Sequence, residues 1–219
     1  MNDIYFNYNT IYVETGVTLS ELSWFALEKE IQGFEFLEDV PGSVGGATIM
    51  NAGTYQDMIG DILSTVTYYS KKFNRVITEE VQKEFFGKRY PIWGERGDTI
   101  LSVSFKVQKR IEDYEPILDK ILLNKKNRYM KQPRDYPNAG SVFKRPYKNG
   151  VGQYVWKLFE GCDLRGFQIG SAMISEKHPG FIVNIDNATP NDILSLLDVA
   201  QTRVKSKYDI DLELEWKII

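Results

Sequence analysis

The sequence has very little of two residue types on which much hydrolytic and metal-dependent chemistry relies. Its 219 residues include one cysteine, Cys162, which excludes an intrachain disulfide and is typical of a protein of the reducing cytoplasm. The single histidine, His178, excludes zinc motifs built on paired histidines and leaves one candidate for a Ser-His or Cys-His nucleophile system. We therefore expect no metal site, and much familiar hydrolase chemistry is argued against.

Long apolar runs and an excess of charge are lacking as well. No run of about 18 apolar residues occurs, so no membrane span is expected. Residues 1–10 show no basic segment followed by an apolar stretch, which argues against a secretory signal and for a cytoplasmic location. With 27 Lys and Arg against 30 Asp and Glu and no basic stripe, nucleic acid is not expected as a partner. The hydrophobic fraction of 42% predicts a globular chain.

Hydrophobic periodicity predicts a mixed α+β chain. A capping box at Thr18–Glu21 begins one predicted helix, and Thr189 followed by Pro190 begins another. The first half is rich in strand and glycine and the second in helix, which predicts two domains, 1–108 and 109–219. The predicted strands are 11–14, 62–69, 99–107, 167–175, 180–185 and 212–218, and the predicted helices are 19–31, 115–130, 153–161 and 190–207.

The segment Pro41-Gly-Ser-Val-Gly-Gly46 is predicted to be an irregular, glycine-rich loop. Its small residues let the backbone approach a ligand closely and point N–H groups at an anion. In Asn51-Ala-Gly-Thr-Tyr55, which follows, Asn51 and Tyr55 add polar and aromatic side chains suited to a nucleotide. A purely structural turn and a surface aromatic are the alternative interpretations, and the pattern leaves them open.

A second cluster surrounds Ser141, in Pro137-Asn-Ala-Gly-Ser141-Val-Phe-Lys144-Arg145. Its hydroxyl, with Lys144 and Arg145 nearby, is suited to a position beside a bound phosphate or carboxylate. Because no GxSxG elbow surrounds it, proton donation is favoured over an acyl-enzyme role. A helix cap or turn serine is the alternative.

The other charged candidates have simpler interpretations as well. Glu213 and Glu215 are predicted to share one face of the last strand, which is usually a solvated face. Arg89 lies in Phe85-Phe-Gly-Lys-Arg-Tyr-Pro91, and its usual interpretation would be a charged residue on the protein surface. His178 falls in a turn and is predicted to be structural or a minor ligand contact.

These clusters occur in a series that resembles one known family. The segments VPGSVGGATIMNAGTY, FFGKRYPIW, ILSVSF, NRYMKQP, NAGSVFKRP, LFEGCDLRG, ISEKHPGFIVN and LELEWKII follow one another over about residues 11–219. In order and spacing they resemble the bacterial UDP-N-acetylenolpyruvoylglucosamine reductases, the MurB family. The resemblance implies an α+β fold: the second FAD-binding subdomain of the MurB and vanillyl-alcohol-oxidase-like flavoprotein fold, then a C-terminal substrate domain whose last strand, 212–219, returns to the flavin side.

The resemblance also implies a reaction. Members of the family are flavoenzymes of peptidoglycan synthesis that use NADPH to reduce FAD, and the flavin reduces the enolpyruvyl ether of UDP-N-acetylglucosamine to the lactyl ether of UDP-N-acetylmuramate. The family serine that protonates the enol matches Ser141. The family arginine and last-strand glutamate match Arg89 and Glu215, which would stabilise the developing enolate.

By the same resemblance, further residues would hold the cofactor and the UDP-amino-sugar. The cofactor-binding residues implied are Pro41, Gly42, Ser43, Val44, Gly45, Gly46 and Gly53. The substrate-binding residues implied are Tyr55, Asn51, Lys144 and Arg145.

The sequence departs from the family pattern at several points. Family members carry a segment before the point where this chain begins, with a Gly-x-Gly-x-Asn loop for the FAD pyrophosphate, and residues 1–10 contain nothing like it. Losing two or three charge-assisted hydrogen bonds of ~1.5–3 kcal/mol each would weaken FAD affinity by several orders of magnitude, so tight intrinsic binding is not expected. The family's Tyr-Arg-x-Ser-x-Phe reads Lys88–Trp93, Arg145 stands where the family has Asn, and Asp163 replaces a common glycine.

Three hypotheses follow from this comparison. The first is a MurB-like reductase, active or vestigial, and the second is a non-catalytic UDP-sugar-binding module. The third is an enzyme repurposed for a related enol ether or sugar nucleotide in surface polysaccharide synthesis. The face that the absent segment would cover predicts a homodimer or a second protein bound there.

Overall fold

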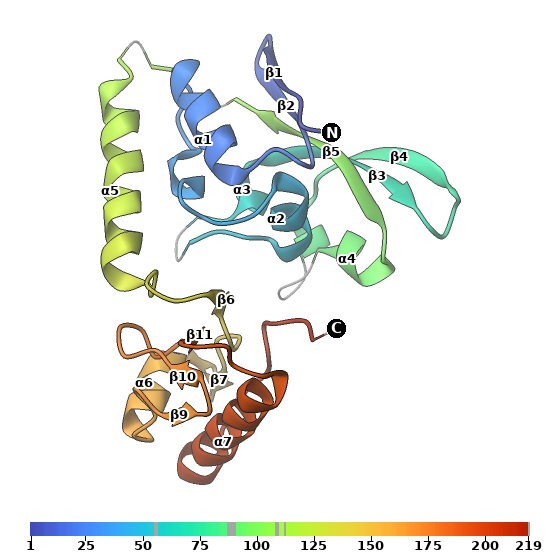
Figure 1. The fold of residues 1–219 in the computed structure, drawn as a ribbon. Coiled ribbons are helices and arrows are strands. Elements are labelled where there is room, and N and C mark those ends of the chain that lie inside the picture. Colours follow the sequence, from blue (N-terminus) through green and yellow to red (C-terminus); the bar gives the residue numbers. More distant parts are fainter. Residues whose placement is uncertain (55–56, 87–90, 108–109, 112, 219) are drawn as a thin grey trace. The chain divides into compact units, whose positions relative to one another are not determined.

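A computed structural model describes residues 1–54, 57–86, 91–107, 110–111 and 113–218 (Figure 1). The chain divides into two compact units, Met1–Asn127 and Arg128–Ile219. This division lies later than the expected one at 108–109, because the first unit includes most of helix α5 (Glu115–Lys131), whose Ile117 and Ile121 pack with Leu27.

The first unit is built on a five-stranded antiparallel sheet in the order β1-β2-β5-β3-β4. Alternation along the strands buries Ile11 and Val13 of β2 beneath the helices and leaves Tyr12 outside, where its ring stacks on Tyr5. Helix α2 packs on β2 and β5. Besides α5, the elements are β1 (Ile4–Asn7), β2 (Thr10–Glu14), α1 (Leu19–Glu28), η1 (Glu35–Leu37), α2 (Val44–Met50), α3 (Ile59–Ile62), β3 (Leu63–Ser70), β4 (Arg75–Glu80), η2 (Lys83–Phe86), α4 (Ile92–Arg96) and β5 (Thr99–Lys106).

The second unit has a four-stranded antiparallel sheet in the order β6-β11-β10-β9 and a small hairpin, β7-β8. Helix α7 packs on β9 and β10 and buries Leu196, Leu197, Ala200 and Val204. Its elements are β6 (Asn138–Ser141), β7 (Tyr147–Lys148), β8 (Val151–Gly152), α6 (Val155–Gly161), β9 (Gln168–Ile169), β10 (Ala172–Ile174), β11 (Phe181–Asn184) and α7 (Pro190–Tyr208).

The predicted capping box at Thr18–Glu21 and the predicted helix start at Thr189 and Pro190 are both confirmed. The Thr18 side chain accepts the N–H of Glu21, whose carboxylate accepts the N–H of Thr18, and α1 begins there. Thr189 and Asp192 make the same reciprocal pair at the start of α7. These bonds satisfy N–H groups that have no partner inside the helix, which is why they locate a helix start so well.

Three local predictions are wrong. The loop Pro41–Gly46 is not irregular throughout, because α2 begins at Val44. The strand expected over 167–175 is split into β9 and β10 by a turn at Gly170, where φ is +55°. The strand expected over 212–218 is reduced to a single bridge between Leu214 and Phe143.

Candidate functional site

Ser141 ends strand β6 and stands opposite Phe181 of β11. The N–H of the next residue, Val142, donates to the carbonyl of Gly180 at 3.0 Å. Val142 and Phe143 are buried, while the Ser141 side chain is exposed. The strand is thus anchored in the core directly beyond a hydroxyl that stays open to solvent.

The C-terminal segment lies along the other edge of the same strand. Glu215 donates its backbone N–H to the carbonyl of Val142 at 2.8 Å, and Lys144 donates its N–H to the carbonyl of Glu213 at 2.9 Å. Between them Phe143 and Leu214 form the antiparallel bridge. The structure therefore brings Ser141 and Glu215, two of the three predicted catalytic residues, into neighbouring backbone positions within the second unit.

The two basic residues after Ser141 are held by that unit. The Lys144 ammonium forms an ion pair with Glu213, and the Lys144 side chain is 15% exposed against 73% for Glu213. The Arg145 guanidinium lies 4.2 Å from the centroid of the Tyr154 ring and donates to the carbonyl of Gly152 at 3.1 Å. Stacking on a ring and donation to a carbonyl orient a guanidinium without pairing it with a negative charge. The Arg145 guanidinium can therefore still bind an anion.

The loop Pro41–Gly46 lies against the turn that precedes α1. Val44 donates its N–H to Val17 at 2.8 Å, and Gly45 donates to Thr15 at 3.1 Å. A Cβ on Gly45 would stand 2.7 Å from the Thr15 Cβ, so glycine is needed for this close approach. Gly42 has φ of +124°, a conformation that other residues rarely adopt.

The residues of this loop fall into two groups. Val44 and Gly45 are buried and their N–H groups are used within the chain, so they support the loop. Pro41 and Gly42 are exposed, and Ser43 is half-buried. No described residue accepts the N–H of Gly42 or Ser43. The loop therefore offers a ligand the N–H groups of Gly42 and Ser43, and Gly46 is exposed beside them.

Asn51 and Gly53 have structural roles in this arrangement. Asn51 ends α2 in the left-handed conformation, with φ of +45°, and its Oδ1 accepts the N–H of Gly60 at 3.0 Å. A Cβ on Gly53 would lie 2.2 Å from the carbonyl oxygen of Asp57. These contacts show that both residues help to fix the local backbone conformation. The predicted site residues Tyr55 and Arg89 lie outside the described residues.

His178 supports the turn behind Ser141. Its Nδ1 accepts the N–H of Gly180 at 3.1 Å, and its ring packs edge-to-face on Phe181. Burial lowers the pKa of His178 below its usual 6.5. Gly180 in turn accepts the N–H of Val142, so this histidine shapes the strand that carries Ser141. Sequence reasoning missed that connection, because it depends on a contact between distant segments.

A metal site and a membrane-spanning helix were also sought among the described residues. No three His, Cys, Asp or Glu side chains of the described residues gather closely enough to hold a metal ion. No helix within the part of the chain that the structure describes is long and apolar enough to cross a membrane.

Sequence comparison identifies relatives over the full chain. The family model described as UDP-N-acetylenolpyruvoylglucosamine reductase, C-terminal domain, matches residues 132–219. A curated UDP-N-acetylenolpyruvoylglucosamine reductase from Clostridium kluyveri is 40% identical over all of this chain, which covers 70% of it. One of the same name from Thermotoga maritima is 37% identical over all of this chain, which covers 74% of it.

A solved structure agrees with the sequence relatives. The crystal structure of UDP-N-acetylenolpyruvylglucosamine reductase (MurB) from Thermus caldophilus matches with a TM-score of 0.77 and 31% identity, over 94% of this chain and 71% of that chain. The expected α+β fold class is thereby confirmed. This chain belongs to the family of UDP-N-acetylenolpyruvoylglucosamine reductases.

Proposed function

We propose that this protein reduces the enolpyruvyl ether of UDP-N-acetylglucosamine to the lactyl ether of UDP-N-acetylmuramate, with FAD and NADPH, as a cytoplasmic step of peptidoglycan precursor synthesis. The observation that carries the proposal is the pairing of the Ser141 strand with the Glu215 segment. This pairing places the Ser141 hydroxyl and the Glu215 carboxylate on two segments that are hydrogen-bonded to each other. The relatives of this chain bear the name of that reductase.

Ser141 is proposed to protonate the carbon next to the substrate carboxylate. Its exposed hydroxyl can reach a bound substrate, and a hydroxyl acts as a general acid when it is held within hydrogen-bond reach of the reacting atom. Glu215 and Arg89 would stabilise the enolate as it develops. The net reaction adds a hydride and a proton across the enol double bond.

The loop Pro41–Gly46 fits the flat ring of a flavin. Apart from the two chain neighbours of Gly42, no heavy atom of the described residues lies within 4 Å of the position that a Cβ would take there, so the backbone is open to a ligand. Pro41, Gly42, Ser43 and Gly46 would contact the ring, with Val44, Gly45 and Gly53 supporting them. When bound, FAD supplies the hydride that it takes from NADPH.

Lys144 and Arg145 are proposed to bind the diphosphate of the UDP-amino-sugar. Both cations follow Ser141 within four residues, and guanidinium groups suit phosphate oxygens in a bidentate arrangement. Tyr55 and Asn51 are proposed to contact the uridine nucleotide. A homodimer or a second protein bound to this chain stays a prediction, and sedimentation velocity tests the homodimer.

The decisive experiment follows flavin and product separately. Purified protein is incubated with FAD, desalted and examined for flavin absorbance and for quenching of flavin fluorescence. It is then given NADPH and the enolpyruvyl substrate, and the lactyl product is sought by mass spectrometry. We expect product from the wild type and none from Ser141→Ala, although NADPH still reduces the flavin in that variant.

Two results would contradict the proposal. One is the absence of product from protein that holds reduced flavin and substrate together. The other is thermal stabilisation by UDP-N-acetylglucosamine with none by FAD, which would favour the non-catalytic UDP-sugar-binding module.

A further inference from the structure

Two buried carboxylates precede the loop Pro41–Gly46 and have no role in the proposed chemistry. Glu35 begins η1 and is 7% exposed, and Glu38 follows η1 and is 2% exposed. A carboxylate taken out of water is costly unless cations or hydrogen-bond donors compensate it. Their partners therefore show what these positions are for.

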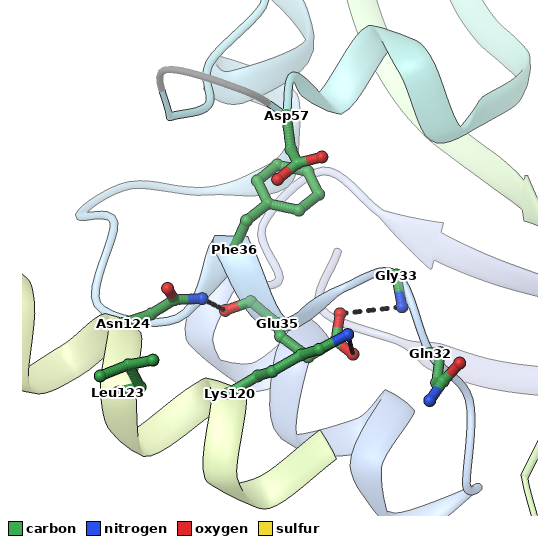
Figure 2. A pocket seen from close by; sticks show the side chains of 8 residues that line it. All are labelled: Gln32, Gly33, Glu35, Phe36, Asp57, Lys120, Leu123 and Asn124. Atoms are coloured by element: carbon green, nitrogen blue, oxygen red, sulfur yellow. Dashed lines mark hydrogen bonds and ion pairs between the residues drawn. The ribbon is translucent and has the colours of Figure 1, made fainter. Parts of the chain in front are cut away.

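The Glu35 carboxylate accepts the N–H of Gly33 at 2.9 Å, and further contacts to Glu35 and Glu38 come from helix α5. The Lys125 ammonium lies 3.1 Å from Oε1 of Glu38, and Asn124 Nδ2 donates to the carbonyl of Glu35 at 3.0 Å. Lys120 is a looser partner, 3.8 Å from Oε1 of Glu35. Figure 2 shows Asn124 and Lys120 reaching from adjacent turns of α5 toward Glu35, beside an open pocket of about 480 Å³. The contacts of Lys125 and Asn124 are called the α5 clamp below.

Helix α5 has few other attachments to the first unit. In its 17 residues, Ile117 and Ile121 are the buried side chains, and they lie in its first half. The apolar cluster that they form with Leu27 is small. The polar contacts of Asn124 and Lys125 therefore fix the later part of the helix against η1.

The backbone between Glu38 and the loop has little freedom. Val40 donates its N–H to the carbonyl of Leu37 at 3.2 Å, and Asp39 donates to Oγ of Ser20 at 3.2 Å. Asp39 has φ of +65°, so the chain turns sharply immediately before Val40 and Pro41. A displacement of the Glu38 carboxylate would be passed to the loop rather than absorbed.

We propose that Lys125 and Asn124 are positioning residues, which hold the loop Pro41–Gly46 in the conformation that receives the flavin by clamping Glu38 and Glu35. This inference rests on the proposed function for the flavin role of the loop. A pre-organised backbone binds more tightly because less ordering is needed when the ligand arrives. The clamp acts through η1 and touches neither cofactor nor substrate.

The test compares Lys125→Met with Lys120→Met. Methionine keeps much of the length of lysine and removes its charge. Lys120 is the matched control because it lies on the same helix, is 62% exposed and pairs outside hydrogen-bond distance. Amide hydrogen exchange is measured on the flavin-free protein, at Val44 and Gly45 of the loop and in the central strands β3 and β5. In Lys125→Met we expect exchange at the loop to rise roughly tenfold, with less than about a twofold change in the strands.

A conservative variant and a flavin measurement complete the experiment. Lys125→Arg keeps the cation and should restore slow exchange at the loop, and Glu38→Gln should repeat the effect of Lys125→Met. The dissociation constant for FAD should rise roughly tenfold in Lys125→Met and stay unchanged in Lys120→Met. If Lys125→Met does not fold, Lys125→Gln takes its place.

Unchanged exchange at the loop, or an equal rise in loop and strands, overturns the clamp as a positioning device. The exchange measurement needs no flavin, so it decides on the clamp even if the wild type binds no FAD. Absence of FAD binding would instead count against the proposed function.

Discussion

The backbone N–H of Glu215 donates to the carbonyl of Val142 at 2.8 Å, one residue beyond Ser141. The segment Ser141–Lys144 is therefore paired with Gly180 and Phe181 on one edge and with residues 213–215 on the other. A strand paired on both edges has little freedom to shift. Because the backbone of this segment is held in place, the effects of substituting Ser141 and Lys144 can be predicted from their side chains.

Replacing Ser141 with alanine is expected to abolish turnover without unfolding the protein. The side chain is exposed, so the free energy of unfolding should change by less than about 0.5 kcal/mol. Loss of a general acid should lower kcat by roughly 10²–10⁴-fold. Steady-state kinetics measure the change in kcat, and denaturant melts measure the change in the free energy of unfolding. Ser206→Ala, at an exposed position of α7, is the control. A variant that retains wild-type kcat would remove Ser141 from the mechanism.

The ion pair of Lys144 and Glu213 provides a test of phosphate binding. Lys144→Met should raise the dissociation constant for UDP-N-acetylglucosamine by roughly ten- to a hundredfold, because a charge-assisted hydrogen bond is worth ~1.5–3 kcal/mol. Glu213→Gln should leave binding the same or slightly tighter, since Glu213 is 73% exposed and competes for the cation. Titration calorimetry measures both constants, and equal weakening in the two variants would show that the pair acts structurally.

His178 predicts a loss of stability in mild acid. Burial lowers the pKa of His178 below 6.5, so below that pH the unfolded chain takes up the proton more readily than the folded protein. Stability should therefore fall as the pH drops below about 6.5 and should be insensitive to this residue above it. Urea melts between about pH 7 and pH 5 measure the slope. His178→Asn retains an acceptor for the N–H of Gly180 and should reduce the dependence of stability on pH.

The capping box of α7 predicts a local stability effect. Thr189→Ala removes the acceptor for the N–H of Asp192 and should cost about 1 kcal/mol in the unfolding of the second unit. Thr202→Ala, at an exposed position inside the same helix, should be neutral or slightly stabilising because alanine is the better helix former. Denaturant melts followed by circular dichroism compare the variants. A larger loss from Thr202→Ala would contradict the capping account.

Cys162 is expected to be unreactive in the folded protein. Its side chain is buried, and burial raises the pKa of the thiol, which depletes the reactive thiolate at neutral pH. A water-soluble disulfide reagent should therefore label it slowly in buffer and rapidly in denaturant. Rapid labelling of native protein would mean that the core around α6 opens readily.

The sequence predicts best those elements whose determinants are local. A capping box predicted the start of α1, and Thr189 followed by Pro190 predicted the start of α7; both helices begin where these patterns place them. The glycines of the loop Pro41–Gly46 concealed the start of α2, although Ser43 supplies a cap for the N–H of Gly46. The exposed strand β4 lacks a buried alternation and gave no signal.

Features that depend on distant contacts could not be predicted in this way. The alternation of Leu and Glu after Leu212 indicates a strand, but a strand needs a partner along its length. Among the described residues of that segment, only 213–215 pair with the Ser141 strand. The contact of Lys125 with Glu38 joins residues 87 positions apart. No local pattern encodes it. The roles proposed for Ser141 and Glu215 come from a family resemblance, and their adjacency emerged from tertiary pairing.

Each of the two units encloses a separate apolar core, one around Phe105 and Trp93 and the other around Phe159 and Leu196. A calorimetric scan should therefore resolve two endotherms, because side chains in one core can melt while the other stays packed. A ligand moves the endotherm of each unit that it binds, by mass action. Flavin should therefore move the endotherm of the unit with the glycine loop, whereas UDP-sugar, proposed to contact Asn51 in one unit and Lys144 in the other, should move both.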